Sequence, residues 1–177
     1  NNLPVQGLIR STIFKVFCAG ETTPQALKTI KNLENYKVSA VLDYVSEGET
    51  TTEVFNYNRD VIVSNIRTLS KEAPGNAISV KLSGLEDPDW LEKVNNLHEE
   101  NMGLTDAARY KKFIARVDAI CAECYAARII VYLDAEDRCM QDVFDNVAAK
   151  MMRKYNREKA LVYNTVQMYL KDRAEYL

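Results

Sequence analysis

The amino-acid sequence predicts an α/β fold built on a parallel sheet. Short apolar segments rich in β-branched residues alternate with longer segments of helical periodicity. A composition of 47% apolar and 27% charged residues over 177 positions is typical of a folded domain with a sizeable core. The segments that predict buried strands are residues 39–43, 77–81, 129–134 and 160–164.

The segments between these strands predict helices that bury one stripe of side chains. Apolar residues recur at helical intervals in two of them: Phe55, Ile62, Ile66 and Leu69, then Met140, Val143, Val147 and Met151. Thr50 and Glu53 predict a capping box, and Pro74 with Gly75 predicts the end of that helix. Pro24 predicts an earlier helix start, and Asp87-Pro88 predicts a short extra helix before a long one.

Alternating strands and helices imply right-handed crossovers, which close either as a doubly wound sheet or as an eight-stranded barrel. No GxGxxG or GxxxxGK motif follows any predicted strand, and this argues against the common nucleotide-binding sheets. We therefore predict a (β/α)8 TIM-barrel type of which about the first four βα units are present. Residues 1–37 are expected to form leading helices and residues 38–177 the first half of the barrel.

Charge and apolar runs restrict the classes of partner. The net charge of −2 and pI near 5.6 leave no basic excess for phosphates, so nucleic acid is not an expected partner. No apolar run approaches the roughly 18 residues of a membrane-spanning helix, and the first residues lack the apolar core of a secretory signal. We therefore expect an intracellular protein.

Cysteine and histidine content does not favour a metal site. Cys121 and Cys124 form a lone CxxC pair, which we interpret as small apolar residues on a helical stripe with Phe113, Val117 and Ile120. The single histidine, His98, lies in a charged stretch and is expected to be exposed. No metal ligand set is therefore predicted.

Polar residues gather where the predicted strands end. Alternation along residues 77–83 sends Ile78 and Val80 toward the helices and Lys81 toward the interior, near the carboxyl end of its strand. The matching ends of the other strands carry Asp43, Asp134 and Asn164, followed in the loops by Glu47, Glu136 and Gln167. Catalytic groups of barrels gather at this end, and we expect Asp43, Lys81, Asp134 and Asn164 to converge on one hollow. Alternatively, Glu47 and Glu136 only cap the following helices.

Four stretches in order resemble the strand-end motifs of proline dehydrogenases: LDYVSEG at 42–48, VKLSGL at 80–85, LDAE at 133–136 and YNTVQMYLKD at 163–172. The stretch STIFKVFCAGE at 11–21 resembles the first helix of the single-function members. The resemblance implies a barrel holding FAD, which accepts a hydride from carbon five of L-proline and yields 1-pyrroline-5-carboxylate.

The resemblance also implies roles for individual residues. Lys81 would hold the proline carboxylate, and Glu47 would pair with a later arginine as a gate over the substrate. Asp134 would organise the pocket, and the Asn164 amide would touch the flavin ring. Asp43 and Gln167 match further polar positions. The expected site is therefore Lys81, Asp134, Asp43 and Glu47 around the substrate, with Asn164, Gln167 and Asp134 toward the cofactor.

The same resemblance sets expectations for partners and completeness. It implies L-proline as substrate, a quinone as electron acceptor and peripheral membrane contact, in the bacterial cytoplasm or on the matrix side of the mitochondrial inner membrane. A full barrel has roughly 250 residues, so we expect residues 1–177 alone to be inactive and to self-associate through open sheet edges. The alternatives are a non-catalytic half-barrel, or another flavin barrel such as a methylenetetrahydrofolate reductase.

Overall fold

The computed structural model describes residues 7, 12–44, 50–95, 97 and 99–177, and it confirms the predicted α/β fold. Its sheet consists of four parallel strands in chain order: β1 (Val41–Asp43), β2 (Ala77–Val80), β3 (Ile130–Leu133) and β4 (Val162–Asn164). Each strand lies within a segment predicted to be extended. The strand order has no reversal, which distinguishes this sheet from a doubly wound one and matches the first part of a βα barrel.

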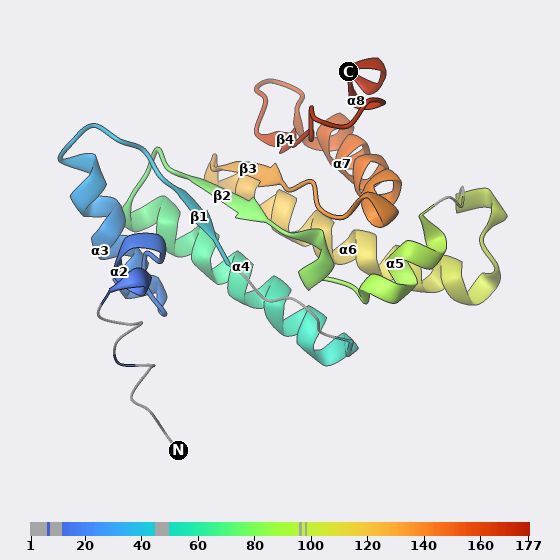
Figure 1. The fold of residues 1–177 in the computed structure, drawn as a ribbon, viewed down its shortest axis with the longest axis horizontal. Helices are drawn as coiled ribbons and strands as arrows, with labels where there is room; N and C mark the ends of the chain where they lie inside the picture. The colour runs from blue at the N-terminus through green and yellow to red at the C-terminus, as the bar shows by residue number, and fades with distance from the viewer. Residues whose placement is uncertain (1–6, 8–11, 45–49, 96, 98) are drawn as a thin grey trace.

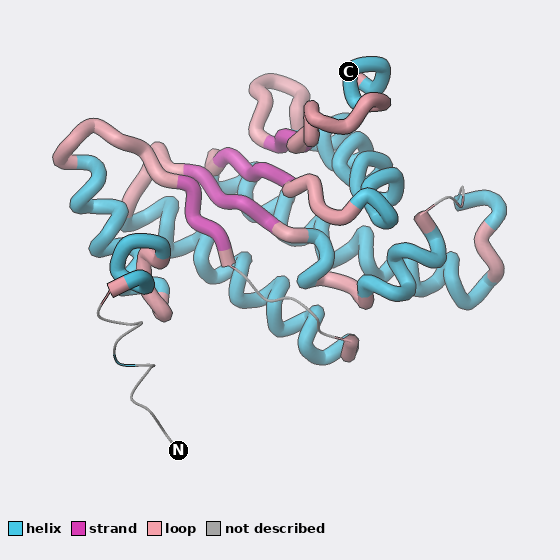
Figure 2. Tube along the Cα trace, in the orientation of Figure 1, coloured by secondary structure: helices cyan, strands magenta, loops and turns pink. Residues whose placement is uncertain are grey.

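Helices precede and connect the strands. The N-terminal pair is α2 (Ile13–Phe17) and α3 (Thr23–Glu34), and the others are α4 (Thr52–Glu72), α5 (Pro88–Val94), α6 (Leu104–Ala127), α7 (Gln141–Tyr155) and α8 (Arg173–Tyr176). Figures 1 and 2 show the strands in front of α4 and α6, which pack against each other and cover one face of the sheet. Within the described ranges, every helix is too short or too polar to cross a membrane.

The core lies between that face of the sheet and the helices. Alternate strand residues point into it and are almost completely buried: Ile78, Val80, Val131, Leu133 and Val162. The predicted stripe of α6 meets them there, because Phe113, Val117, Ile120 and Cys124 are all fully buried. Burial raises the pKa of the Cys124 thiol to about 12, so this group is an apolar packing residue at neutral pH.

The helix boundaries agree with the predicted signals except at one position. Pro24 lies in the first turn of α3, the Asp87 side chain caps α5, and Gly75 follows α4 with a φ of 92° that suits glycine. The predicted capping box at Thr50 is wrong. Helix α4 begins one residue later, so Thr51 is the N-cap and its hydroxyl accepts from the Val54 N–H at 3.4 Å.

Candidate functional site

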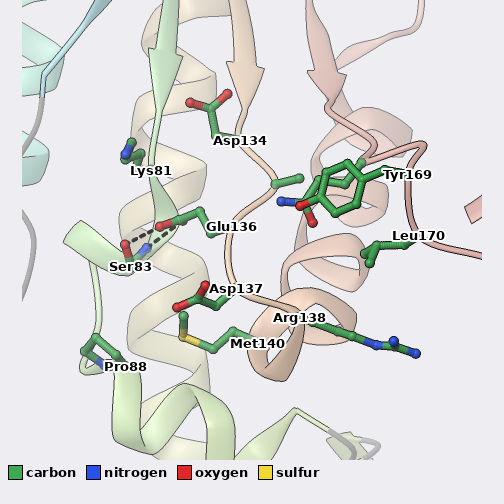
Figure 3. A pocket seen from close by; sticks show the side chains of 12 residues that line it. Lys81, Ser83, Pro88, Asp134, Glu136, Asp137, Arg138, Met140, Tyr169 and Leu170 are labelled. Carbon is green, nitrogen blue, oxygen red and sulfur yellow. Dashed lines mark hydrogen bonds between the residues drawn. The ribbon is translucent and has the colours of Figure 1, made fainter.

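A cavity of about 680 Å³ lies beyond the carboxyl ends of β2 and β3 (Figure 3). Its wall comes from both strand ends, from the loop after β3 and from the segment after β4. The lining residues are Lys81, Ser83, Pro88, Asp134, Ala135, Glu136, Asp137, Arg138, Met140, Gln167, Tyr169 and Leu170. This is the end of a barrel sheet at which active sites are found.

Lys81 and Asp134 lie at the same level of adjacent strands. Val80 of β2 pairs with Leu133 of β3. The residues that follow them, Lys81 and Asp134, therefore lie opposite each other. Because Val80 and Leu133 point into the helix layer, alternation turns Lys81 and Asp134 to the opposite, inward face. The Ser79 hydroxyl, also on the inward face, donates to Asp134 Oδ2 at 2.7 Å and fixes the orientation of this carboxylate.

Glu136 is the second carboxylate that reaches the cavity. Its two oxygens accept from the backbone N–H of Ser83, at 3.1 Å, and from the Ser83 hydroxyl. Burial raises the pKa of Glu136 above its usual value, although the Ser83 hydrogen bonds and the charge of Lys81 act in the opposite direction. Glu136 does not cap the helix that follows it, because Met140 is the N-cap of α7 and Asp137 that of the short 3-10 helix before it. Its carboxylate instead accepts from the short 3-10 helix after β2.

Gln167 closes another side of the cavity. It belongs to the segment after β4, together with Tyr169 and Leu170, which Figure 3 shows facing the loop after β3. Gln167 therefore shares one cavity with Lys81 and Asp134, although it is more than thirty residues from either along the chain.

The expectation that Asn164 converges with these residues is wrong. Asn164 pairs with Leu133 rather than with Asp134, so its side chain points toward the helices. There its amide Nδ2 donates to Asp145 Oδ1 of α7 at 2.8 Å. The inward residue level with Asp134 is Thr165, one position later, and its hydroxyl accepts from the Ala135 N–H at 2.5 Å.

The other two predicted residues have different outcomes. Asp43 pairs with Ser79, so it shares the inward face but lies one level below Lys81, and it does not line this cavity. Glu47 and His98 lie outside the described residues, so their predicted roles and exposure stay predictions. The structure thus brings together Lys81, Asp134 and Gln167 from the predicted set.

Sequence reasoning did not select Ser83, Tyr169 or Arg138 as site residues. Ser83 had a usable signal, since it continues the inward alternation of Ser79 and Lys81. Arg138 begins a three-residue 3-10 helix and Tyr169 lies in a turn, and neither segment is long enough for a periodicity to indicate which way a side chain points.

The donor set of the cavity fits one end of a flavin cofactor. A lysine ammonium, a glutamine amide and a tyrosine ring offer hydrogen bonds and stacking suited to a flavin ring and a small carboxylate substrate. The charged residues that line it are two basic and three acidic side chains, Lys81, Arg138, Asp134, Glu136 and Asp137. That balance does not suit a diphosphate, so the fit is to the ring end of FAD alone.

Comparisons with known proteins indicate the family of the chain. The family model described as proline dehydrogenase matches residues 26–177. Proline dehydrogenase 1, mitochondrial, of Dictyostelium discoideum is 27% identical over 202 residues, covering 94% of this chain and 35% of that protein. The probable mitochondrial proline dehydrogenase of Schizosaccharomyces pombe is 26% identical over 206 residues, covering 92% of this chain and 42% of that protein. This chain therefore spans less than half the length of these relatives.

A solved structure gives the same fold. Proline utilization A from Bdellovibrio bacteriovorus, inactivated by N-propargylglycine, superposes with a TM-score of 0.76 at 18% identity, covering 98% of this chain and 19% of that one. The family match also favours proline dehydrogenase over the methylenetetrahydrofolate reductase alternative. With its part-barrel fold and a match that extends from residue 26 to its last residue, the chain belongs to the proline dehydrogenase family.

Proposed function

We propose that these residues form the substrate-facing first half of an enzyme that oxidises L-proline to 1-pyrroline-5-carboxylate in proline catabolism, with FAD as the hydride acceptor. The observation that carries the proposal is the placement of Lys81 and Asp134 side by side on adjacent strand ends, in one cavity. Membership of the proline dehydrogenase family supports the choice of substrate.

Lys81 binds the proline carboxylate in this proposal. An ammonium group at the cavity wall forms a charge-assisted hydrogen bond with a carboxylate, which fixes one end of a small amino acid. Fixing that end determines which ring carbon approaches the hydride acceptor.

Asp134 stabilises the charge that develops as the hydride leaves carbon five. When the hydride leaves with its electron pair, carbon five becomes electron-deficient. The ring nitrogen shares the positive charge, and the C–N bond becomes an iminium. A carboxylate already oriented by the Ser79 hydroxyl lowers the energy of that positive charge without reorganising. Glu136 adds a second acidic group to the same wall.

FAD, when bound, supplies the two-electron acceptor that no side chain of this cavity provides. Gln167 offers its amide to the flavin ring. Asp43 shares the inward face of the sheet but lies outside the cavity, and the substrate roles expected of Asp43 and Glu47 stay predictions. A quinone receives the electrons through peripheral membrane contact. The word mitochondrial in the names of the Dictyostelium and Schizosaccharomyces relatives supports the matrix side of the inner membrane for a eukaryotic source.

The test replaces Lys81 by Met in the flavin-loaded natural protein and measures steady-state proline oxidation with a quinone acceptor. Loss of one charge-assisted hydrogen bond is expected to lower kcat/KM for proline roughly 10- to 100-fold, mainly through KM. Lys31→Met is the matched control, because Lys31 of α3 pairs with Glu72 of α4 on the exposed surface. Equal kcat/KM values for Lys81→Met and the unmodified protein would contradict the assignment.

A further inference from the structure

The loop after β3 is attached to three separate elements through three consecutive backbone N–H groups. Asp134 N–H donates to Val80 O of β2 at 3.0 Å, and Ala135 N–H donates to the Thr165 hydroxyl beyond β4. Glu136 N–H donates to Gln141 Oε1 at 3.2 Å. The first partner is a backbone carbonyl of the sheet, and the second is the side chain of the residue that follows β4. The third is a side chain at the start of α7. The position of Glu136 therefore depends on how Gln141 is held.

Gln141 is held by a partner on the side away from the cavity. Its side chain is buried, and its Nε2 donates to Asp145 Oδ1 one helical turn later, at 2.8 Å. A glutamine amide has one accepting and one donating end. Because the Asp145 carboxylate only accepts, it selects the orientation in which Gln141 Oε1 faces the Glu136 N–H.

Asp145 is in turn held by α8 and β4. Its Oδ2 accepts from Arg173 Nη1 at 2.6 Å, and both side chains are less than a tenth exposed. The Asn164 amide donates to the other oxygen. A buried carboxylate requires such a counter-charge, since its desolvation is otherwise uncompensated. Because Asp145 belongs to α7 and Arg173 to α8, this ion pair ties α8 to α7.

We propose that Gln141 is a positioning residue for Glu136, and that the buried Asp145–Arg173 pair fixes the orientation of the Gln141 amide. We call this chain of contacts the relay. It runs from Arg173 of α8 through Asp145 and Gln141 of α7 to Glu136 in the cavity wall, where Ser83 donates hydrogen bonds to the Glu136 carboxylate. Its effect on proline oxidation rests on the proposed function, but its effect on the Glu136 backbone does not.

The test measures native-state hydrogen exchange of the Glu136 amide in the natural protein as purified. Gln141→Leu removes the acceptor, and Asp145→Asn removes the selection of amide orientation. Each is expected to accelerate exchange at Glu136 roughly 5- to 10-fold relative to the Ile78 amide in β2, the loss of about one hydrogen bond. Asp118→Asn is the control, because Asp118 binds Lys154 and Tyr155 between α6 and α7, outside the relay.

The double variant Gln141→Glu with Asp145→Asn exchanges the amide and the carboxylate between the two positions. The carboxylate introduced at position 141 would accept from both the Glu136 N–H and the amide introduced at position 145. Because the total charge is the same, protection of the Glu136 amide is expected to return toward its original value. Unchanged exchange in Gln141→Leu, or a double variant no better protected than Asp145→Asn alone, would overturn the proposal.

A second readout separates this proposal from the proposed function. In the flavin-loaded protein, Gln141→Leu is expected to raise KM for proline more than it lowers kcat, since a displaced Glu136 changes the wall of the substrate cavity. If the unmodified protein does not oxidise proline, the proposed function fails while the exchange measurement still decides the relay. If KM and kcat both stay unchanged while Glu136 exchanges faster, the relay has no bearing on the substrate site and that part of the proposal is overturned.

Discussion

The two faces of the sheet come from the same four strands, yet they differ in burial and in polarity. On the helix-facing side, Val80 and Leu133 are completely buried among apolar side chains. On the inward side, the neighbouring Lys81 and Asp134 are only partly buried and line a polar cavity. Alternation along each strand therefore assigns stability to one face and chemistry to the other, so that substitutions one residue apart are expected to have different consequences.

The helix side of the sheet also contains a buried cluster of charged residues, which departs from its otherwise apolar character. Glu86 is 2% exposed and accepts from Arg116 Nη1 at 3.1 Å and from Arg109 Nη2 at 2.7 Å. Arg116 also donates to the backbone carbonyl of Leu85 and lies over the Phe55 ring. These contacts connect α6 with α4 and with the segment after β2, away from the cavity.

Arg116→Met is expected to produce the largest loss of stability, about 3–5 kcal/mol, because it leaves the Glu86 carboxylate without its buried partner. Equilibrium urea unfolding measures the loss. Arg109→Met is the comparison variant and should cost less, since the Arg109 side chain is 36% exposed and water can replace it. Equal losses for the two variants would show that burial does not determine the strength of this cluster.

The helix-facing row gives a second, slightly smaller expected effect. Leu133→Ala removes a fully buried side chain from β3 and is expected to cost about 2–5 kcal/mol of unfolding free energy. Ser79→Ala, one strand away on the inward face, should cost about 1 kcal/mol, since it removes one hydrogen bond to Asp134. The same urea measurement compares them, and a Ser79→Ala loss as large as that of Leu133→Ala would remove the distinction between the faces.

Much of this division could be predicted from the sequence, because it follows from two short periods. The apolar alternation of residues 78–82 identified the buried row and turned Lys81 inward, and the helical stripe of α6 was correct at every position. The prediction was wrong at Asn164, where an amide at a strand end was assumed to face the same way as Asp134. Alternation puts Asn164 on the same face as Val162, but the adjacent Leu161 is also apolar and buried, so the local pattern did not decide which face met the helices. The pairing of Asn164 with Leu133 decides it, and that long-range contact is not visible in the sequence.

The relay behind the cavity was also beyond sequence reasoning, although it left a trace. Gln141 and Asp145 are spaced four apart on the buried side of α7, where the apolar stripe would otherwise continue. Two polar residues in such positions indicate a buried partner, but the partner, Arg173, lies in a short C-terminal helix whose docking depends on tertiary contacts. The pattern could therefore show that a polar network exists, not what it contacts.

The smallest expected effect concerns the inward face itself and its dependence on pH. Because burial raises the pKa of Glu136 in the folded protein, its contribution to stability is fully present below the ordinary glutamate value of 4.5 and is lost as pH rises through the raised pKa. Glu136→Gln removes this titration. The variant should therefore gain stability over the unmodified protein as pH rises from about 4 to about 7, by about 1.4 kcal/mol for every pH unit that separates the raised pKa from the ordinary one. Urea unfolding of both proteins at several pH values measures the difference, in which other titrating groups cancel. If the difference does not vary with pH, the pKa of Glu136 is the same in the folded and the unfolded protein. Its ionisation in the cavity wall then does not lower the free energy of unfolding.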